Sequence, residues 1–500
     1  MGRSACGRSV LDDAAGSMKG KTSMSANRRE VMAGAGALAL ASSLPGTARA
    51  ADFVSHRPAK AERNFTSPAI EVEIARVKAM IGDPEIAWMF ENCYPNTLDT
   101  TVETGTVDGK PDTFVITGDI NAMWLRDSSA QVQPYIHLVG RDPQLKRLFQ
   151  GLIQRQARCI LIDPYANAFN KDPTAPSKLD WSQKDKTDMK PGVAERKWEI
   201  DSLCYPMRLA HGYWTRTRDK VPFDEVWSRA ARLSVATFRV QQRLNGPGPY
   251  HFQREAFVPS DSLMLDGYGR PTRKIGLIHS MFRPSDDACI YPYLIPSNLF
   301  AVSALRKLAQ VHREARGDAA AAFEADALAD EVEKLLHEHA LIDDGRGGKV
   351  WAYEIDGFGN WVFMDDANVP SLSGLAIIDA AKRDDPLFRN TAAQAWSERN
   401  PYFFKGSAAE GIGGPHVGLG MIWPMSIITH AMNADDDATV LQCLRWLKTT
   451  HAGTGFMHES FNKDDPSNFT RKWFAWANAL FGQLIVELAA RKPALLAGRL

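Results

Sequence analysis

The chain has 500 residues, and its 59 basic and 59 acidic side chains give a formal net charge of zero at pH 7. This balance excludes a strong electrostatic attraction to nucleic acid or to an anionic membrane surface. Hydrophobic residues make up 44% of the chain and 13 residues are Trp, which predicts a globular protein with a large core. Many aromatic rings also suit a neutral, polar ligand such as a sugar, whose apolar face stacks on an indole ring.

The first 50 residues have the pattern of an export signal. Arg28 and Arg29 precede an apolar stretch over 31–44, and Ala-Arg-Ala at 48–50 supplies the small residues that a signal peptidase needs. This order is typical of a twin-arginine signal. The apolar stretch is too short and too rich in Gly and Ala for a spanning helix, which needs about 20 apolar residues. We predict a cleaved signal over 1–50 and a periplasmic protein, with a disordered N-terminal tail as the alternative.

From about residue 70 onward, apolar residues recur at spacings of three and four, which indicates a series of helices with short connections. Strand patterns are few: one at 112–117, and a hairpin of 349–355 with 360–364. The expected helices lie near 71–90, 126–139, 145–160, 200–216, 226–244, 297–314, 319–340, 371–382, 421–433, 437–449 and 473–488.

About a dozen helices in one series, without a repeat of 34 to 47 residues, favour a closed helical toroid over a solenoid. We therefore predict an all-α fold, an (α/α)6 barrel, with a few short strands and hairpins at its rim. Loops at one rim would then build the pocket. The long segment 163–199, which carries Trp181 and Trp198, is typical of such a loop. Because no linker composition divides the chain, we expect a single catalytic domain over 51–500.

Metal and disulfide chemistry have little support in the sequence. Five cysteines follow the signal, widely scattered and without CxxC spacing, which argues against a disulfide scaffold and a cysteine zinc site. The tight cluster His337-Glu338-His339 does not have HExxH spacing, and on a helix its two histidines lie about 200° apart. We expect no metal and no cofactor.

Five short clusters combine acidic, aromatic and Gly or Pro residues, and they lie at 121–127, 199–201, 282–288, 411–416 and 456–461. In the third, Ser285 precedes Asp286 and Asp287 at an expected helix start, where acids commonly cap the helix. Adjacent carboxylates on a helix point about 100° apart, so one can cap while the other faces a pocket.

In the fifth cluster, Glu459 stands among Phe456, Met457 and Phe461. Burial there would raise its pKa, which suits acid/base work, whereas the alternative is a rim glutamate paired with Lys or Arg. Hydrolysis of a glycosidic bond needs two carboxyl groups flanking one bond, about 6.5–9.5 Å apart in the inverting case. Two acids far apart in sequence, each on a rim segment, meet that need without a metal.

Six sequence blocks resemble glycoside hydrolase family 125, the metal-independent exo-α-1,6-mannosidases. They run in the family's order from about residue 94 to 478. The matching blocks are Asn96-Thr97-Leu98-Asp99 with Thr117-Gly118-Asp119, Met123-Trp124-Leu125-Arg126-Asp127-Ser128, Lys197-Trp198-Glu199-Ile200-Asp201, Phe282-Arg283-Pro284-Ser285-Asp286-Asp287, Gly411-Ile412-Gly413-Gly414-Pro415-His416 and Met457-His458-Glu459-Ser460.

The resemblance implies an (α/α)6 barrel, inversion of configuration, an aspartate as general acid and a glutamate as general base. Carried over block by block, the base is Glu459 and the acid is Asp286 or Asp287, of which we prefer Asp286. The other aspartate would bind sugar hydroxyls or orient its neighbour. The remaining candidates for substrate binding are the Arg126-Asp127 pair as a clamp for the terminal mannose, with Trp124, Glu199, Asp201, Arg283, His416 and His458.

The expected function is therefore an inverting exo-α-1,6-mannosidase whose partner is a mannose-containing oligosaccharide or glycan. Two alternatives remain on the sequence alone. One is a non-catalytic sugar-binding protein on the same barrel. The other is a different helical-barrel enzyme, such as a glucoamylase-like hydrolase or a polysaccharide lyase. The sequence does not indicate the oligomeric state.

Overall fold

The computed structural model describes residues 53–256 and 258–500, and Phe53–Leu500 form one compact unit. The export signal expected at 1–50 lies outside these residues. Among the described helices, none combines the length and the apolar character that a membrane span requires.

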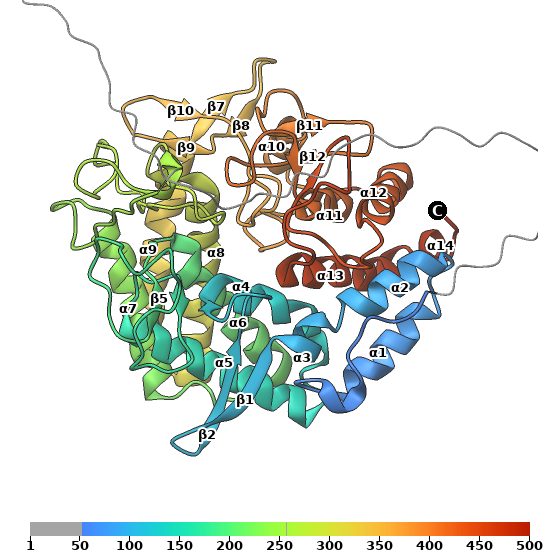
Figure 1. The fold of residues 1–500 in the computed structure, drawn as a ribbon. Coiled ribbons are helices and arrows are strands. Elements are labelled where there is room, and N and C mark those ends of the chain that lie inside the picture. The colour runs from blue at the N-terminus through green and yellow to red at the C-terminus, as the bar shows by residue number, and fades with distance from the viewer. Residues whose placement is uncertain (1–52, 257) are drawn as a thin grey trace, which may run out of the picture. The chain divides into compact units, whose positions relative to one another are not determined.

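Five helices follow one another around the inside of the unit, and every residue of one of them from Ala475 to Gly482 is buried. A helix that is buried on all sides belongs to the interior. The inner helices are α4 (Leu125–Val132), α6 (Ile200–Thr217), α8 (Ile295–Val311), α11 (Pro424–Asn433) and α13 (Ala475–Arg491). The contacts run from α4 to α6 and from α6 to α8, and from α11 to α13 and back to α4, so that only the position between α8 and α11 is left for another segment (Figure 1).

A sixth inner position, between α8 and α11, is filled by hydrogen-bonded turns. We expected a helix at 371–382, and this prediction is wrong, because the segment forms turns over 371–380. The carboxylate of Asp365 accepts hydrogen bonds from the backbone N–H groups of Leu372 (2.7 Å) and Ser373 (2.9 Å). Such side-chain bonds compete with the helical pattern.

The turn segment is nevertheless part of the ring. On one side the hydroxyl of Ser303, on α8, donates to the carbonyl of Asp379 at 2.9 Å. On the other, the side-chain amide of Asn433, at the end of α11, donates to the carbonyl of Ser373 at 2.7 Å. The inner layer therefore has six members, five helices and one irregular segment.

Outer helices cover the ring, and each buries only one face. In the longest of them, buried Ala325, Leu328, Val332 and Leu336 recur at spacings of three and four. The expected helix at 71–90 is divided in two at Asp83-Pro84, and one outer helix, at 386–395, was not predicted. The outer helices are α1 (Pro68–Lys78), α2 (Pro84–Cys93), α5 (Pro143–Ile162), α7 (Glu225–Gln241), α9 (Ala319–His339), α10 (Pro386–Ala395) and α12 (Asp437–Thr450).

The two layers differ at their helix starts. Each outer helix begins after a Ser or Asp whose side chain accepts a backbone N–H: Ser67, Asp83, Asp142, Asp224, Asp318, Asp385 or Asp436. The five inner helices of the described chain begin after Trp, Glu, Leu or Phe and have no such side-chain cap. In α4, α6 and α8 the first N–H group donates instead to another segment: Leu125 to the carbonyl of Asn167, Ile200 to the hydroxyl of Ser280, and Ile295 to the carbonyl of Tyr353. The positive dipole ends of the inner helices carry no capping side chain of their own.

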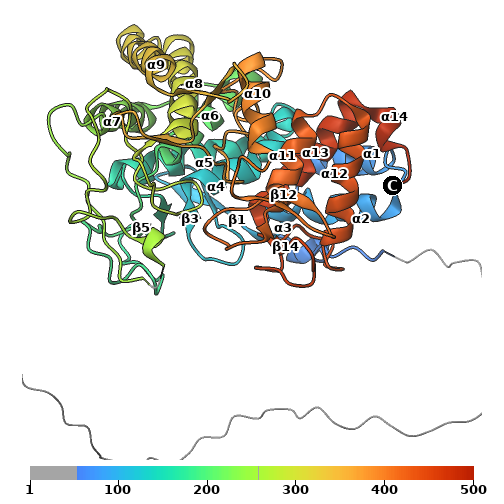
Figure 2. The ribbon, with the colours of Figure 1, turned by 90° about the horizontal axis from the view of Figure 1, so that it is seen from above.

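Short strands precede several inner helices. Figure 2 shows β3, β5 and β14 along one side of the unit. These strands are β3 (Met123–Trp124), β4 (Ala168–Phe169) and β5 (Val193–Glu195) in one sheet, β6 (Tyr293–Leu294), β9 (Glu354–Ile355) and β10 (Trp361–Val362) in another, and β13 (Met421–Ile422) paired with β14 (Phe461–Asn462).

The remaining strands form hairpins. The expected hairpin around 356–359 is present as β9–β10, but the strand expected at 349–355 is divided between two sheets. The strand expected at 112–117 is present, and its partner at 102–107 was not predicted. These hairpins are β1 (Val102–Val107) with β2 (Lys110–Val115), β7 (Leu341–Asp343) with β8 (Lys349–Trp351), and β11 (Phe403–Lys405) with β12 (Glu410–Ile412).

Candidate active site

A buried arginine connects the starts of two inner helices. Arg126 stands in the first turn of α4, and its Nη1 lies 2.6 Å from Glu199 Oε2 and 3.1 Å from Asp201 Oδ2. Glu199 is the N-cap residue of α6 and Asp201 lies in its first turn. All three side chains are buried. The uncapped starts of α4 and α6 therefore meet around one ion-paired cluster, which we call the Arg126 cluster.

Asp127 also belongs to the Arg126 cluster. Its Oδ2 lies 3.5 Å from Arg126 Nε, and its Oδ1 accepts a 2.6 Å hydrogen bond from the hydroxyl of Thr117. Thr117 follows β2, so the cluster is also tied to the outer hairpin.

Asp286 and Asp287 lie in a tight turn, so the expected helix start at Ser285 is wrong. The backbone N–H of Arg283 donates to the carbonyl of Asp287 (2.7 Å), and that of Asp286 donates to the carbonyl of Arg283 (2.9 Å). Asp286 has φ +68°, in the left-handed region, and the next helix begins only at Ile295. A residue other than Gly in that region is uncommon and is associated with functional turns.

The turn separates the two aspartates. Asp286 Oδ1 lies 3.6 Å from Arg126 Nη2 and 3.5 Å from Asn167 Nδ2, and its side chain is 28% exposed. Asp287 is buried and accepts a 2.8 Å hydrogen bond from the hydroxyl of Ser260. Of the two, Asp286 is the one in contact with the Arg126 cluster while still open to solvent.

Glu459 approaches the same region from the C-terminal part of the chain. Its Oε1 lies 3.3 Å from Nη1 of Arg471, and its side chain is 14% exposed. Arg471 also forms an ion pair with Asp119 and donates to the carbonyl of Thr117 at 3.1 Å. Because Thr117 binds Asp127, two residues connect Glu459 to the Arg126 cluster. The pairing with an arginine agrees with the structural alternative weighed for this glutamate, and it also orients the carboxylate.

Burial dominates the electrostatics of the Arg126 cluster. It raises the pKa of Glu199 well above the usual value, and it raises the pKa of Asp201 and Asp127, although Arg126 opposes each shift. Burial would also raise the pKa of Asp286, but Lys197 and Arg126 outweigh it and hold that pKa below its usual value. The two pKa values are therefore shifted in opposite directions, which favours the protonated form of Glu199 and the ionised form of Asp286.

The other predicted residues surround this centre. Trp124 is buried in β3, and His416 is exposed on the loop before β13. Burial raises the pKa of Asp287, and the charge of His416 opposes this shift. Arg283 is directed elsewhere, because its Nε donates to Glu354 Oε1 at 2.6 Å. His458 stacks on Phe469 with its Nδ1 2.9 Å from the carbonyl of Lys472.

Three residues at the centre were not predicted as site residues. Lys197 donates to the backbone carbonyl of Asp286 at 2.7 Å. Asn167 contacts the side chain of Asp286, and Arg471 holds Glu459. Lys197 stands inside one of the six sequence blocks, so the resemblance could have marked it as a candidate site residue. Asn167 and Arg471 lie outside the quoted motifs, so nothing in the local sequence marks them.

Within residues 53–256 and 258–500, no group of three His, Cys, Asp or Glu side chains is arranged to hold a metal ion. Arg126 supplies the positive charge between the carboxylates instead. A closed helical barrel with several carboxyl groups gathered at the starts of its inner helices suits the acid/base chemistry by which glycoside hydrolases break a sugar bond.

Comparison with known proteins narrows this class to one family. Residues 83–486 match the family model described as metal-independent α-mannosidase, GH125. The chain belongs to this family, and it is accordingly a glycoside hydrolase.

Two relatives cover most of the chain. The Meiotically up-regulated gene 157 protein of Schizosaccharomyces pombe is 42% identical over 457 residues, which is 88% of this chain and 89% of that protein. A solved structure of a Streptococcus pneumoniae metal-independent α-mannosidase, in a non-productive complex with α-1,6-mannobiose, is 37% identical with a TM-score of 0.81. It covers 86% of this chain and 100% of its own.

A GH78 rhamnosidase from Bacillus sp. GL1 shares the fold only, with 11% identity, a TM-score of 0.50, and coverage of 82% of this chain and 35% of that one.

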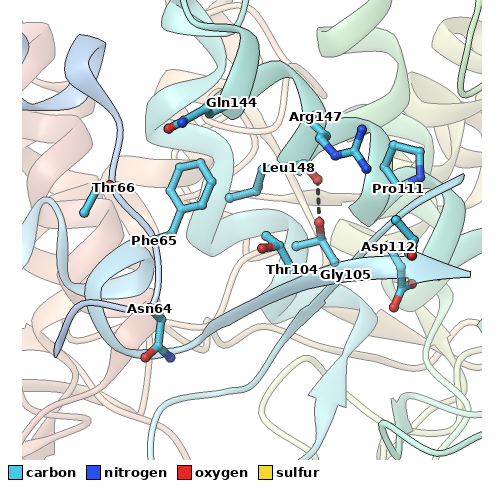
Figure 3. A pocket seen from close by; sticks show the side chains of 12 residues that line it. Asn64, Phe65, Thr66, Thr104, Gly105, Pro111, Asp112, Gln144, Arg147 and Leu148 are labelled. Atoms are coloured by element: carbon cyan, nitrogen blue, oxygen red, sulfur yellow. Dashed lines mark hydrogen bonds between the residues drawn. The ribbon is translucent and has the colours of Figure 1, made fainter. Parts of the chain in front are cut away.

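A cavity of about 450 Å³ lies away from the Arg126 cluster (Figure 3). It is bounded by the β1–β2 hairpin, residues 64–66 and the outer helix α5. The side chains of Phe65, Gln144 and Arg147 line it. Thr113 and Leu148 also line it, and the hydrogen bond from the hydroxyl of Thr113 to the carbonyl of Leu148, 2.9 Å long, fixes the hairpin to α5. None of its lining residues belongs to the predicted site.

Proposed function

We propose that the protein removes mannose from the non-reducing ends of α-1,6-linked mannosides with inversion of configuration. The observation that carries the proposal is that Asp286 and Glu459, from distant parts of the chain, both connect to the Arg126 cluster. The chemistry requires one carboxyl group that gives a proton and one that takes a proton.

In the proposed reaction, Asp286 is the general acid and Glu459 the general base. Asp286 delivers a proton to the oxygen that links the terminal mannose to the next sugar, and that C–O bond breaks. Glu459 takes a proton from a water, whose oxygen forms the new bond to the anomeric carbon on the opposite face. The product is β-mannose together with the shortened glycan.

Asp286 is ionised at rest, so its proton must come from a neighbour. Glu199 is the neighbour that supplies it, because burial favours its protonated form and both carboxyl groups contact Arg126. The proton moves from Glu199 to Asp286, and Asp286 passes it to the glycosidic oxygen as the C–O bond breaks. The cycle closes when Glu459 releases the proton taken from water and Glu199 takes up a proton from solvent. Such a shared proton belongs to the pair of carboxyl groups, which titrate together.

The α-1,6 linkage is part of the proposal because the Streptococcus pneumoniae relative was solved with α-1,6-mannobiose. The purified chain lacking residues 1–50 should be assayed on α-1,6-, α-1,3- and α-1,2-mannobiose, with proton NMR of the first sugar released. We expect hydrolysis of the α-1,6 isomer and β-mannose as the initial product. Initial release of α-mannose would contradict inversion, and shortening of an α-1,6-mannan from its interior would contradict exo action.

A further inference from the structure

An exposed tryptophan stands close to the proposed acid. Trp181 lies in the segment between β4 and β5, and 45% of the residue is exposed. Its indole N–H nevertheless donates to Glu195 Oε1 at 3.1 Å. An aromatic ring that is held by its polar edge while its face is open to solvent is suited to stacking on a ligand.

A chain of hydrogen bonds connects this ring to Asp286. Glu195 Oε2 accepts from Asn167 Nδ2 at 3.0 Å, and the same Nδ2 lies 3.5 Å from Asp286 Oδ1. The amide of Asn167 is oriented for this contact because its oxygen accepts the backbone N–H of Lys197 at 3.0 Å. Two buried side chains, those of Glu195 and Asn167, thus connect Trp181 to Asp286, the proposed acid.

The position of the ring is fixed from several directions. Ser177 precedes Trp181 and Ser182 follows it. The hydroxyls of both serines donate to the carbonyl of Ala194, at 2.6 and 2.7 Å. Arg254 donates to Glu195 Oε1 at 2.9 Å, which holds the carboxylate that accepts the indole N–H. A preorganised ring loses little conformational freedom when a ligand stacks on it.

We propose that Trp181 is the stacking platform for the leaving-group sugar. This inference rests on the proposed role of Asp286 as acid. The acid protonates the oxygen that joins the two sugars, so the leaving sugar must lie beside Asp286. Trp181 is 45% exposed and is connected to Asp286 through Glu195 and Asn167, and the apolar face of a pyranose complements an indole ring.

A second exposed tryptophan provides a matched control. Trp361 on β10 is 49% exposed, close to the value for Trp181. It lines a separate cavity of about 480 Å³ together with Phe358 and the end of α9, and within the described residues no recorded hydrogen bond connects its side chain to Asp286 or Glu459.

The test compares two substrates that differ only in the leaving group. α-1,6-Mannobiose has a leaving sugar, whereas α-mannosyl fluoride releases fluoride, which makes no contact with a sugar platform. We expect Trp181→Ala to lower kcat/KM roughly tenfold for mannobiose. The same variant should change kcat/KM for the fluoride less than about twofold. Trp181→Phe, which keeps a ring but not the N–H, should recover part of the loss on mannobiose, and Trp361→Ala should behave as the wild type on both substrates.

Each result decides a different question. Equal losses on both substrates in Trp181→Ala, or unchanged values on both, would overturn the platform. An equally selective loss in Trp361→Ala would overturn the specific assignment to Trp181. Failure of the wild-type chain to hydrolyse either substrate would overturn the proposed function, and this inference with it.

Discussion

Arg126 faces four carboxyl groups, those of Asp127, Glu199, Asp201 and Asp286, with a single positive charge. If all four were ionised, the buried cluster would keep uncompensated negative charge, which is costly where water is excluded. A proton held by one of the four carboxyl groups lowers that cost, and burial favours it on Glu199. The protonation that lowers the charge of the cluster therefore also provides a proton that glycoside hydrolysis can use.

The proposed roles of the acid and the base can be distinguished by comparing two substrates with different leaving groups. Asp286→Asn should lower kcat on α-1,6-mannobiose by about 10²–10⁴ but have a much smaller effect on α-mannosyl fluoride, because fluoride leaves without protonation. Glu459→Gln should lower kcat by a similar factor on both substrates, because both need an activated water. Steady-state kinetics of the two variants measures this difference.

Asp287→Asn is the control for this pair, because Asp287 is buried and bound to Ser260. If Asp287→Asn rather than Asp286→Asn showed the substrate-dependent loss, the acid would be Asp287, and the preference between the two would be wrong.

Glu199→Gln tests the proton store. The variant keeps the neutral charge of the protonated acid but has no proton to pass to Asp286. In the wild type, kcat on mannobiose should fall as the pH rises through the raised pKa of Glu199, because the acid then lacks its proton source. We expect Glu199→Gln to lower kcat and to alter this basic limb, as measured in a pH–rate profile. An unchanged profile would remove Glu199 from the proton path.

Arg126, Glu199 and Asp286 each stand in a short block that combines unusual residue types, and the structure brings the three together, while their roles stay predictions. The sequence could not predict Asn167 or Arg471. Their importance arises from contacts made across the fold, and a single Asn or Arg in an irregular loop carries no local pattern. The acidic doublet was found, but its left-handed turn was mistaken for a helix cap.

Among the elements, the contrast between capped outer helices and uncapped inner helices bears directly on the site. A capping side chain satisfies the first N–H groups of a helix and covers its positive end. At α4 and α6 the chain instead places Asp127, Glu199 and Asp201 in or beside the first turn. Negative charge is favoured at these ends, so the helix starts help Arg126 to hold several carboxylates.

The turn segment at 371–380 carries a prediction about pH. Burial raises the pKa of Asp365 to about 7, so the folded protein keeps a proton that the unfolded chain releases near pH 4. The folded state then binds more protons, and this carboxyl group's contribution to stability is present below about pH 4 and is lost as the pH rises to about 7. Asp365→Asn does not titrate, so its melting temperature relative to the wild type should increase between pH 4.5 and pH 7.5.

Thermal melts of both proteins across this pH range provide the measurement. Asp365→Asn also loses stability at every pH, because the amide cannot accept both backbone N–H groups of Leu372 and Ser373, so the prediction concerns only how the difference in melting temperature changes with pH. A difference in melting temperature that stays constant with pH would contradict it.

Element prediction succeeded where apolar periodicity decides the structure and failed where side chains bind the backbone. The inner helix α13 and the outer helices α5 and α9 were found close to their ends because their apolar residues recur regularly. At 371–382 the apolar pattern is present, but the side chain of Asp365 accepts the backbone N–H of Leu372 and so replaces a helical hydrogen bond. The strand β1 was missed because its residues from Glu103 to Thr106 are exposed, so no alternation of apolar side chains marks it.

At the scale of the whole molecule, the charge arrangement predicts that activity is independent of metal ions. Arg126 pairs with Glu199, Asp201 and Asp286, so its guanidinium supplies positive charge to these carboxyl groups. Dialysis of the purified chain against EDTA should leave kcat/KM on α-1,6-mannobiose unchanged. A loss of activity that calcium restores would contradict this expectation.

Export is a further proposal about the whole chain. It is motivated by Arg28 and Arg29 before the apolar stretch 31–44. Replacing both arginines with lysine should keep the full-length chain, with residues 1–50 attached, inside the cell. Fractionation followed by mass measurement of the N-terminus checks this. Periplasmic, processed protein from the double variant would contradict a twin-arginine route.

The two ends of the compact unit meet on the same outer helix. Phe53 packs against Trp88 of α2, with ring centroids 5.2 Å apart, and the backbone N–H of Leu500 donates to Asp83, the N-cap of that helix. Asp83 and Trp88 are five residues apart, which corresponds to roughly 7.5 Å along a helix. A short peptide is therefore expected to join the two ends of the unit. A circular permutant, joined there and opened at the Asp108-Gly109 turn, would keep the barrel intact while shifting its termini to the hairpin. If this permutant folds, the barrel does not depend on the order in which its segments are synthesised.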